Sequence, residues 1–458
     1  MPSRRGARVA ELQHPLVPLV LLEGDFAKAF LGRILSSLPL DERLRAREVC
    51  RGWCALLEDA SFWTCVDLSK SCGVNPRFLA GEDRTLALLR AACARAKDNL
   101  LSVDLSHVGT DDDPMNPFVL QWLDSASAAD KASLRDLVAP HMRLIVDHVT
   151  ALCRALPLCR VHCFVYCNAV EALPLLRCEP PFALLSIHEL CVLGDVDGDQ
   201  AVLDLASALS VYQGMEKLTL SYVPLTTRAV VDALMDAAIS AGIKDVSFVG
   251  CGLTQTALPA LTRLIQSPGF ESLEVWNDGR TLFEGPAVPA FCEALRNCTS
   301  LKALELNSLH LWDDTAAATQ LIAAMEGLPA LHTVTLPWNP TNGSPAVQRA
   351  AGECLARLIA RSTSLRDLGV YGSWWAEAGM TPIFEALRGN TVLVELSFGP
   401  IDEELSPEFA RDVVLPAVCA NTSLRRLICL RPEHGEPLPA MDEVQDMLVA
   451  RRLETKAA

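Results

Sequence analysis

One cluster of carboxylates in this sequence has the spacing that calcium binding would use. Asp195, Asp197 and Asp199 alternate as at the start of a calcium loop. The sixth position of that loop is Gln200 where glycine is needed, and the twelfth is Ala206 where a bidentate glutamate is needed. The sequence therefore does not predict a calcium site.

Three cysteines form a second cluster. Cys159, Cys163 and Cys167 recur at a spacing of four, with His162 between them, and zinc could use these ligand types. Cys163 falls at an apolar strand position, so buried thiols are the simpler interpretation. The chain contains no G-x-S-x-G, P-loop, G-x-G-x-x-G or H-E-x-x-H motif. We therefore expect no catalytic residue, no metal and no cofactor, and a protein that is not an enzyme.

The composition excludes several classes of protein. Lys and Arg number 40 against 56 Asp and Glu, a net charge of −16, whereas nucleic-acid binders need clustered cations. Half of the residues are apolar, which excludes a disordered acidic tail. No apolar run reaches membrane-spanning length, and Pro15 and Pro18 interrupt the only stretch that resembles a signal peptide. The odd number of cysteines, 17, fits free thiols in the cytoplasm or nucleus.

A repeat sets the elements that position the remaining functional candidates. The pattern apolar–x–x–apolar–x–apolar recurs about every 30 residues. It starts at residues 63, 100 and 134, and more regularly at 158, 187, 215, 243, 270, 301, 331, 365, 393 and 424. Apolar and mostly polar positions alternate within each copy, as in a β-strand.

The stretch between two strands has the pattern of a helix. In the clearest example, 226–241, Val230, Leu234 and Ala238 line one face, and Gly242 can end the helix. Similar helices are expected over 254–266, 315–326, 346–361 and 408–420. One strand and one helix cannot bury both apolar faces alone, but stacked copies can. Helices pack farther apart than paired strands, so the array must curve with its parallel sheet inside.

The repeat resembles the leucine-rich repeat of ribonuclease-inhibitor type. In 243–264, Cys251 stands at the family's Asn/Cys position, and Leu253 and Thr254 follow as in that family. Asn339 occupies the same position in the copy that starts at residue 331. The resemblance covers about 63–430 and implies an α/β leucine-rich-repeat solenoid, a horseshoe with the sheet inside and helices outside.

Residues 26–68 resemble an F-box, a small helical module. Ile34, Leu35, Ser36 and Leu38 match its I-L-S-x-L segment, and Val49, Cys50 and Trp53 match V-C-x-x-W, with Trp63 as the closing tryptophan. The module usually opens with Leu-Pro, where Phe26 and Ala27 stand here. The resemblance implies docking to the adaptor subunit of a cullin-RING ubiquitin ligase of the SCF type. The residues that would carry this docking are Phe30, Leu31, Ile34, Leu35, Leu38, Val49 and Trp53.

The third, fifth and seventh positions of each strand pattern should face the concave side. Many of these residues are acidic, so a basic partner surface would be attracted there. The candidates for partner binding on this face are His162, Glu189, Lys217, Asp245, Glu274 and Glu305, and exposure is also expected for Arg160, Phe164, Leu193, Asn307, Asp367 and Glu395.

Aromatic residues gather just after the strands. Aromatic side chains are enriched among interface hot spots, so some of these residues should form a recognition edge. The alternative is that they pack under the loops as ordinary core. The candidates are Trp276, Trp338, Tyr371, Trp374 and Trp375, and Trp312 falls in the same region.

The combined interpretation is a non-enzymatic protein-interaction module. The resemblances imply the substrate-recognition subunit of an SCF-type ubiquitin ligase, with a target protein on the concave face that the sequence does not identify. The alternative is a leucine-rich-repeat scaffold or inhibitor, in which the F-box-like part only caps the array. The expected organisation is a flexible N-terminus over 1–22, the F-box-like module over 23–62, the horseshoe over 63–430, and a linker with a C-terminal helix over 431–458.

Overall fold

The computed structural model describes ten stretches of the chain. They are 63–67, 82–97, 99–105, 118–194, 198–277, 281–339, 344–371, 377–399, 406–429 and 439–457. The chain divides into two compact units. Unit 1 comprises Met1–Met142 and Ala151–Val161, and unit 2 comprises Arg143–Thr150 and His162–Ala458. The boundaries expected after residues 22, 62 and 430 lie outside the described residues.

Strands and helices alternate along the described residues. The strands are β1 (Cys65–Asp67), β2 (Ser102–Asp104), β3 (Asp136–Ile145), β4 (Arg160–Asn168), β5 (Leu185–Leu193), β6 (Lys217–Ser221), β7 (Asp245–Val249), β8 (Ser272–Trp276), β9 (Ala303–Asn307), β10 (Thr333–Thr335), β11 (Asp367–Gly369), β12 (Glu395–Phe398) and β13 (Arg426–Cys429).

The helices connect these strands. They are α4 (Glu82–Ala96), α5 (Phe118–Ser125), α6 (Ala128–Ser133), α7 (Val146–Ala155), α8 (Ala169–Leu176), α9 (Asp199–Leu209), α10 (Arg228–Ala241), α11 (Leu258–Ile265), α12 (Val288–Arg296), α13 (Thr315–Met325), α14 (Pro345–Arg361), α15 (Glu377–Gly389), α16 (Pro407–Phe409), α17 (Leu415–Ala420) and α18 (Pro439–Ala457). Three short 3₁₀ turns, Phe182–Leu184, Gln255–Ala257 and Leu311–Asp313, and a π turn, Ala410–Val414, complete the set.

Unit 1 begins with the irregular copies of the repeat. Its strands β1, β2 and β3 pair in parallel. Trp63 and Trp122 are fully buried. The Arg95 guanidinium lies 5.3 Å from the centroid of the Trp63 ring, and the Trp122 indole N–H donates to the Cys93 sulfur at 3.0 Å. The closing tryptophan of the F-box-like pattern is therefore part of the core of this unit.

In unit 2, strands β5 to β13 pair in chain order, all parallel and without a register shift. The second apolar position of each copy therefore stacks on that of the next copy. These positions form a continuous ladder, none of it more than 2% exposed, made of Leu218, Val246, Leu273, Leu304, Val334, Leu368, Leu396 and Leu427. Burial of each such side chain contributes about 1.5–3 kcal/mol.

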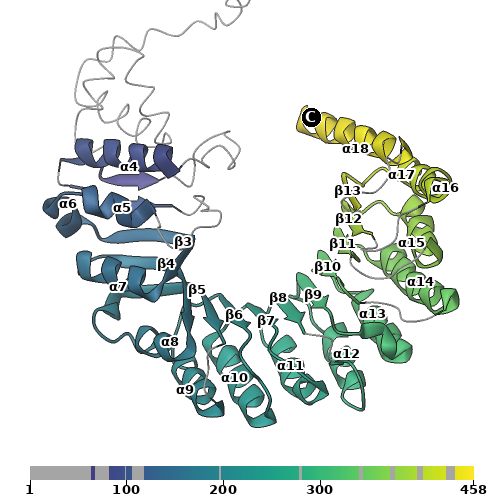
Figure 1. Cartoon of the computed structure of the whole chain (residues 1–458), viewed down its shortest axis with the longest axis horizontal. Coiled ribbons are helices and arrows are strands. Elements are labelled where there is room, and N and C mark those ends of the chain that lie inside the picture. The colour runs from purple at the N-terminus through teal and green to yellow at the C-terminus, as the bar shows by residue number, and fades with distance from the viewer. Residues whose placement is uncertain are drawn as a thin grey trace, which may run out of the picture. The chain divides into compact units, whose positions relative to one another are not determined.

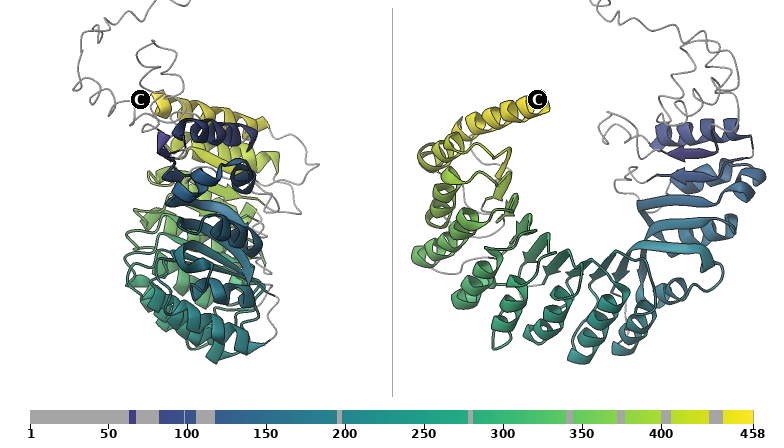
Figure 2. Two further views of the ribbon diagram at one scale, coloured as in Figure 1. Left: turned by 90° about the vertical axis from the view of Figure 1, so that its left-hand side faces the viewer. Right: turned by 180° about the vertical axis from the view of Figure 1, so that it is seen from behind.

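Unit 2 is a curved α/β array. Its strands line the inner side of an arc and its helices line the outer side (Figure 1). The view from behind shows the same two layers (Figure 2). The strands pair at about 4.8 Å while the helices need 8–10 Å, so the two layers have different lengths and the array bends toward the sheet. The expected leucine-rich-repeat solenoid, with a parallel sheet inside and helices outside, is confirmed.

The helices follow the sequence pattern with two differences. Helix α10 ends at Gly242, whose φ of 71° suits glycine. Thr227 stands at its N-cap, but the Thr227 hydroxyl donates to Asp199 at 2.9 Å instead of capping the helix.

The helix expected over 408–420 is broken by the π turn. Pro416 follows this turn, and because proline has no N–H and clashes with the carbonyl four residues earlier, the regular helix cannot continue through it.

Polar side chains close the turns after several strands. The Cys251 thiol donates to the carbonyl of Leu220, and the Asn339 amide donates to those of Leu306 and Pro337. The Asn339 side-chain oxygen accepts from the N–H groups of Leu309 and Leu311. The repeat therefore uses these two positions as the family pattern implies. Asn277, which sequence reasoning did not single out, donates to the carbonyl of Leu253 in the same way.

Helices α14 and α15 approach each other closely at two glycines. A methyl group on Gly352 would collide with the backbone carbonyl of Gly379. We expect Gly352→Ala to lower the free energy of unfolding by about 2 kcal/mol, although helix propensity alone would favour alanine by about 1 kcal/mol. Denaturant titration measures this difference. The matched control is Gly327→Ala, where an added methyl group meets no atom within 4 Å; equal effects of the two changes would contradict this packing.

The described residues were expected to contain neither a membrane-spanning helix nor a metal site. None of the helices described there is long and apolar enough to cross a membrane. No three His, Cys, Asp or Glu side chains in the same residues lie together as metal ligands would.

Candidate protein-binding surface

The inner face of the unit 2 sheet carries three rows of side chains. The in-register pairing places Asp245 beside Ser272, Ser247 beside Glu274, and Val249 beside Trp276. It continues with Glu274 beside Glu305 and Trp276 beside Asn307. Because every strand is in register, residues from repeats about 30 positions apart become direct neighbours on this face.

Charges at the two ends of this face are compensated. Lys217 on β6 forms an ion pair with Glu189 on β5 at 2.7 Å. Arg426 on β13 forms one with Glu395 on β12 at 3.2 Å. These contacts use two of the candidate residues, Glu189 and Lys217, within the protein itself.

The middle of the face has a different charge pattern. On β7 to β11 and the residues directly after them, the inward positions carry four acids and no lysine or arginine. None of these four carboxylates forms an ion pair with a described residue. We call this region the central patch; it consists of Asp245, Glu274, Trp276, Glu305, Asp367 and Tyr371.

Glu274 and Glu305 form the core of the central patch. They lie directly opposite each other on neighbouring strands, which are about 4.8 Å apart. The Ser247 hydroxyl donates to Glu274 at 2.6 Å. Burial, and then the charge of Glu274, raises the pKa of Glu305, while the neighbouring Thr335 on β10 lowers it. Two like charges are thus held side by side in a partly desolvated site.

The outer members of the central patch have related environments. Burial, followed by the charge of Glu271, raises the pKa of Asp245. Burial, followed by the charge of Glu395, raises the pKa of Asp367. Burial and the nearby carboxylates, Glu305 first, also raise the pKa of Tyr371, so its phenol stays neutral and can donate a hydrogen bond.

Exposed aromatic side chains follow one edge of this face. Trp276 is the last residue of β8 and is 38% exposed, and Trp338 follows β10 and is 47% exposed. Tyr222 follows β6 and is 57% exposed. These are the three exposed aromatic side chains among the described residues. We call Tyr222, Trp276, Trp338 and the half-buried Tyr371 the aromatic edge.

Tyr222 was missed by sequence reasoning although a signal was present. It occupies the same place after its strand as Trp338 does, and both have left-handed backbones, with φ of 57° and 54°. Bulky residues rarely adopt this conformation, and such strain is concentrated at functional sites. In both copies the chain keeps an exposed aromatic residue where glycine would be easier, as at Gly250.

Some expectations about exposure are wrong. Phe164 is only 8% exposed, because β4 runs longer than the six-residue pattern and the Arg143 guanidinium lies 5.9 Å from its ring. Asn307 is 9% exposed, next to the large side chain of Trp276. Trp312 is 3% exposed and packs as core under its loop. His162 is half-buried on β4. Trp374 and Trp375 lie outside the described residues, as do Phe30, Leu31, Ile34, Leu35, Leu38, Val49 and Trp53.

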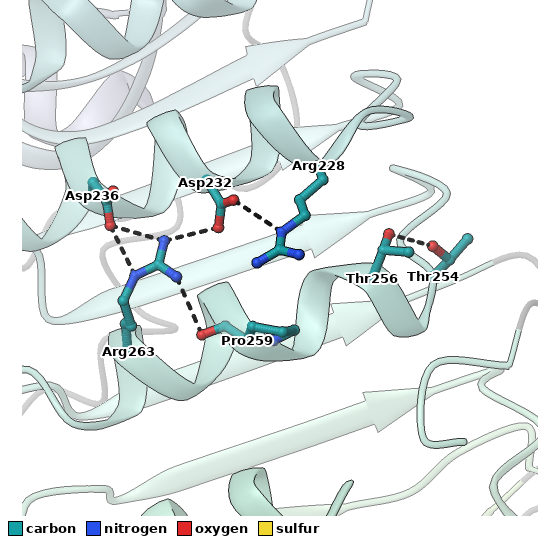
Figure 3. Close-up of polar contacts among 7 residues, drawn as sticks. All are labelled: Arg228, Asp232, Asp236, Thr254, Thr256, Pro259 and Arg263. Atoms are coloured by element: carbon teal, nitrogen blue, oxygen red, sulfur yellow. Dashed lines mark hydrogen bonds and ion pairs between the residues drawn. The ribbon is translucent and has the colours of Figure 1, made fainter. Parts of the chain in front are cut away.

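The helical side of the array has the opposite charge arrangement. Arg263 on α11 contacts Asp232 and Asp236 on α10 at 2.9 and 3.0 Å (Figure 3). Arg228 contacts Asp232 from the other side at 3.3 Å. Acids and arginines on this surface neutralise one another across neighbouring repeats. The carboxylates of the central patch, which form no ion pair with a described residue, therefore differ from these paired acids on the helical side.

The cysteine cluster does not have the geometry of a metal site among the described residues. Cys159, Cys163 and Cys167 are buried, and burial raises the pKa of Cys159 to about 12, which disfavours the thiolate that a metal needs. Asp195 and Asp197 lie outside the described residues.

Comparison with known proteins bears on the N-terminal segment. The family model described as F-box-like matches residues 30–69. No curated protein sequence matches the chain.

Two solved structures are distantly similar. One is described as leiomodin-1 actin-binding site 2; it is 16% identical, the match covers 44% of this chain and 91% of that chain, and the TM-score is 0.26. The other is a TLR13–ssRNA13 complex, 16% identical, with 74% of this chain and 47% of that chain covered and a TM-score of 0.31. Likenesses this weak carry no information about function. The chain thus has an F-box-like segment ahead of a leucine-rich-repeat array.

Proposed function

We propose that this chain is the substrate-recognition subunit of an SCF-type ubiquitin ligase. The F-box-like segment docks the adaptor subunit, and the inner face of unit 2 holds a target protein. No residue of the chain performs chemistry; it supplies proximity between the target and the ubiquitin-transfer machinery. The observation that carries the proposal is the F-box-like match over residues 30–69, directly followed by repeats with an open inner face.

The junction between the two parts supports this role. Trp63 belongs to the matched segment and is fully buried in unit 1 against Arg95. Because this tryptophan packs in the repeat core and β1 pairs with β2, residues 63–67 at the end of the matched segment are anchored in unit 1. A receptor that positions a target for transfer needs such an anchored connection.

Adaptor binding is tested with the purified full chain and recombinant adaptor subunit. The wild-type chain should retain the adaptor, and Ile34→Asp with Leu35→Asp should abolish retention, because two charges would enter an apolar contact. Affinity capture followed by quantitative gel analysis measures it. The matched control carries Leu184→Asp and Val211→Asp, two exposed apolar residues of unit 2, and should bind as wild type does.

Thermal unfolding of both variants separates lost binding from lost folding. A folded wild-type chain that does not retain the adaptor would contradict the proposal. That outcome would favour a leucine-rich-repeat scaffold or inhibitor, in which residues 30–69 only cap the array.

A further inference from the structure

The sheet face of unit 2 defines what kind of target segment it can hold. On β7 to β11 this face presents four carboxylates that form no ion pair with a described residue, next to exposed aromatic rings. Lys217 lies opposite Asp245 and Arg426 acts on Asp367, whereas no lysine or arginine lies on the strands beside Glu274 and Glu305. At the two ends of the same face, and at several places on the helical side, acids are paired with lysine or arginine. A ligand that complements the central patch must therefore bring positive charge and must be able to lie against aromatic rings.

We infer that the central patch binds a basic, extended segment of the target, with an arginine side chain between Glu274 and Glu305. This inference rests on the proposed function, because it names the chemistry of the target that the receptor holds. The partner is identified by charge complementarity to an open sheet face.

The geometry of Glu274 and Glu305 favours a guanidinium over other cations. Their carboxylates sit on adjacent strands, which are about 4.8 Å apart; Ser247 donates to Glu274 from one side, and Thr335 lies opposite Glu305 on the other side. A planar guanidinium has five N–H donors in a fixed fork and can donate to both carboxylates at once. A lysine ammonium is a compact charge without this fork, so it should bind less tightly.

The aromatic edge supplies a second type of contact. Trp276 lies two residues after Glu274 on the same strand, and Tyr371 is close enough for Glu305 to affect its pKa. Cations that lie within about 6 Å of an indole or phenol ring gain additional attraction. A cation held by Glu274 and Glu305 would therefore also be attracted to these aromatic rings, whereas a neutral side chain would not.

The extent of the central patch sets the length of the segment. Asp245 on β7 and Asp367 on β11 are four strand spacings apart, roughly 19 Å. An extended chain covers about 3.3 Å per residue, so roughly six residues cross the patch. A short basic stretch of the target is sufficient, and no folded basic domain is required.

Fluorescence anisotropy with three labelled twelve-residue peptides tests the inference on the full chain. The peptides share one serine- and glycine-rich sequence and differ at three positions, which hold arginine, lysine or citrulline. Citrulline keeps the shape of arginine and lacks its charge. We expect the arginine peptide to bind at least about tenfold more tightly than the citrulline peptide, with the lysine peptide between them.

Matched variants localise the effect. Glu274→Gln with Glu305→Gln should weaken arginine-peptide binding at least about tenfold. Glu293→Gln with Glu353→Gln removes the same number of negative charges from the exposed helical side and should leave the affinity for the arginine peptide unchanged. Trp276→Ala, an exposed position, should weaken binding several-fold. The double variant of the central patch should unfold at a temperature no lower than wild type, because it removes repulsion between like charges.

Three outcomes would overturn the inference. The first is equal binding of the arginine and citrulline peptides. The second is an equal loss in the two double variants, since only net charge would then matter. The third is tighter peptide binding after removal of residues 1–10, because the chain's own Arg4, Arg5 and Arg8 would then be the occupant.

Adaptor retention, measured on the same samples, separates this inference from the proposed function. Adaptor binding without discrimination among the peptides would remove the inference and leave the receptor role intact. Tighter binding of the arginine peptide by a chain that does not bind the adaptor would support the inference about the central patch and remove the receptor role.

Discussion

Asn339→Ala should lower the free energy of unfolding by about 4 kcal/mol. The Asn339 side chain is fully buried and serves four backbone groups: three at the end of β9 and in the turn after it, and the Pro337 carbonyl in its own turn after β10. Alanine leaves the N–H groups of Leu309 and Leu311 and the carbonyls of Leu306 and Pro337 without this partner. Each buried polar group left unsatisfied costs about 1–3 kcal/mol, and partial rearrangement reduces the sum.

Denaturant titration measures the total, and hydrogen exchange localises it. In a repeat array each copy contacts mainly its neighbours, so the faster exchange should concentrate near residues 306–311 and 337–339. The control is Asn297→Ala, at the exposed end of α12, with an expected change below about 0.5 kcal/mol. Similar values for the two asparagines would show that the turn does not depend on this side chain.

Phe384→Ala should also lower the free energy of unfolding by about 4 kcal/mol. Phe384 on α15 is fully buried, and its ring meets those of Phe398 and Phe409 edge to face, with centroids 5.2 and 6.1 Å apart. The substitution removes apolar burial, leaves a cavity and breaks two aromatic contacts.

Chemical denaturation of the full chain measures this effect as well. Trp338→Ala removes a larger aromatic side chain from an exposed position and should change stability by only about 0.5 kcal/mol. A loss of the same size at both positions would mean that ring size, and not burial, determines the effect. Adaptor retention should be normal in folded Phe384→Ala protein, because the matched F-box-like segment is far from it in sequence.

The sequence predicts the array well because its signal is repeated many times. A single six-residue strand pattern is ambiguous, but residues such as Leu218, Leu304 and Leu396 recur at a constant interval, and all of them lie in the buried ladder. Local departures are harder to predict. The π turn before Pro416 and the uncapped start of α10 depend on contacts that a pattern of apolar residues does not contain.

The inner surface was only partly predictable. Strand alternation assigns Glu274, Glu305 and Trp276 to the inner side correctly, because that side follows from position alone. Exposure depends on neighbours from other repeats, so Phe164 and Asn307 were expected at the surface and are buried, and Trp312 follows the alternative of packing as core under its loop. The absence of cations around Glu274 and Glu305 emerges only when residues of five strands are placed side by side. Tyr222 has the same place after its strand as Trp338, which the sequence shows, and its left-handed backbone appears only in the structure.

The central claim is that two separate surfaces of one chain bind two separate proteins. Quantitative affinity purification from cells in which protein degradation is blocked tests this claim directly, with tagged wild type, Ile34→Asp/Leu35→Asp and Glu274→Gln/Glu305→Gln. The account predicts that the first variant loses the adaptor and keeps the other captured proteins, whereas the second keeps the adaptor and loses at least one captured protein. Wild-type chain without the adaptor, or loss of both classes of partner in either folded variant, would contradict it.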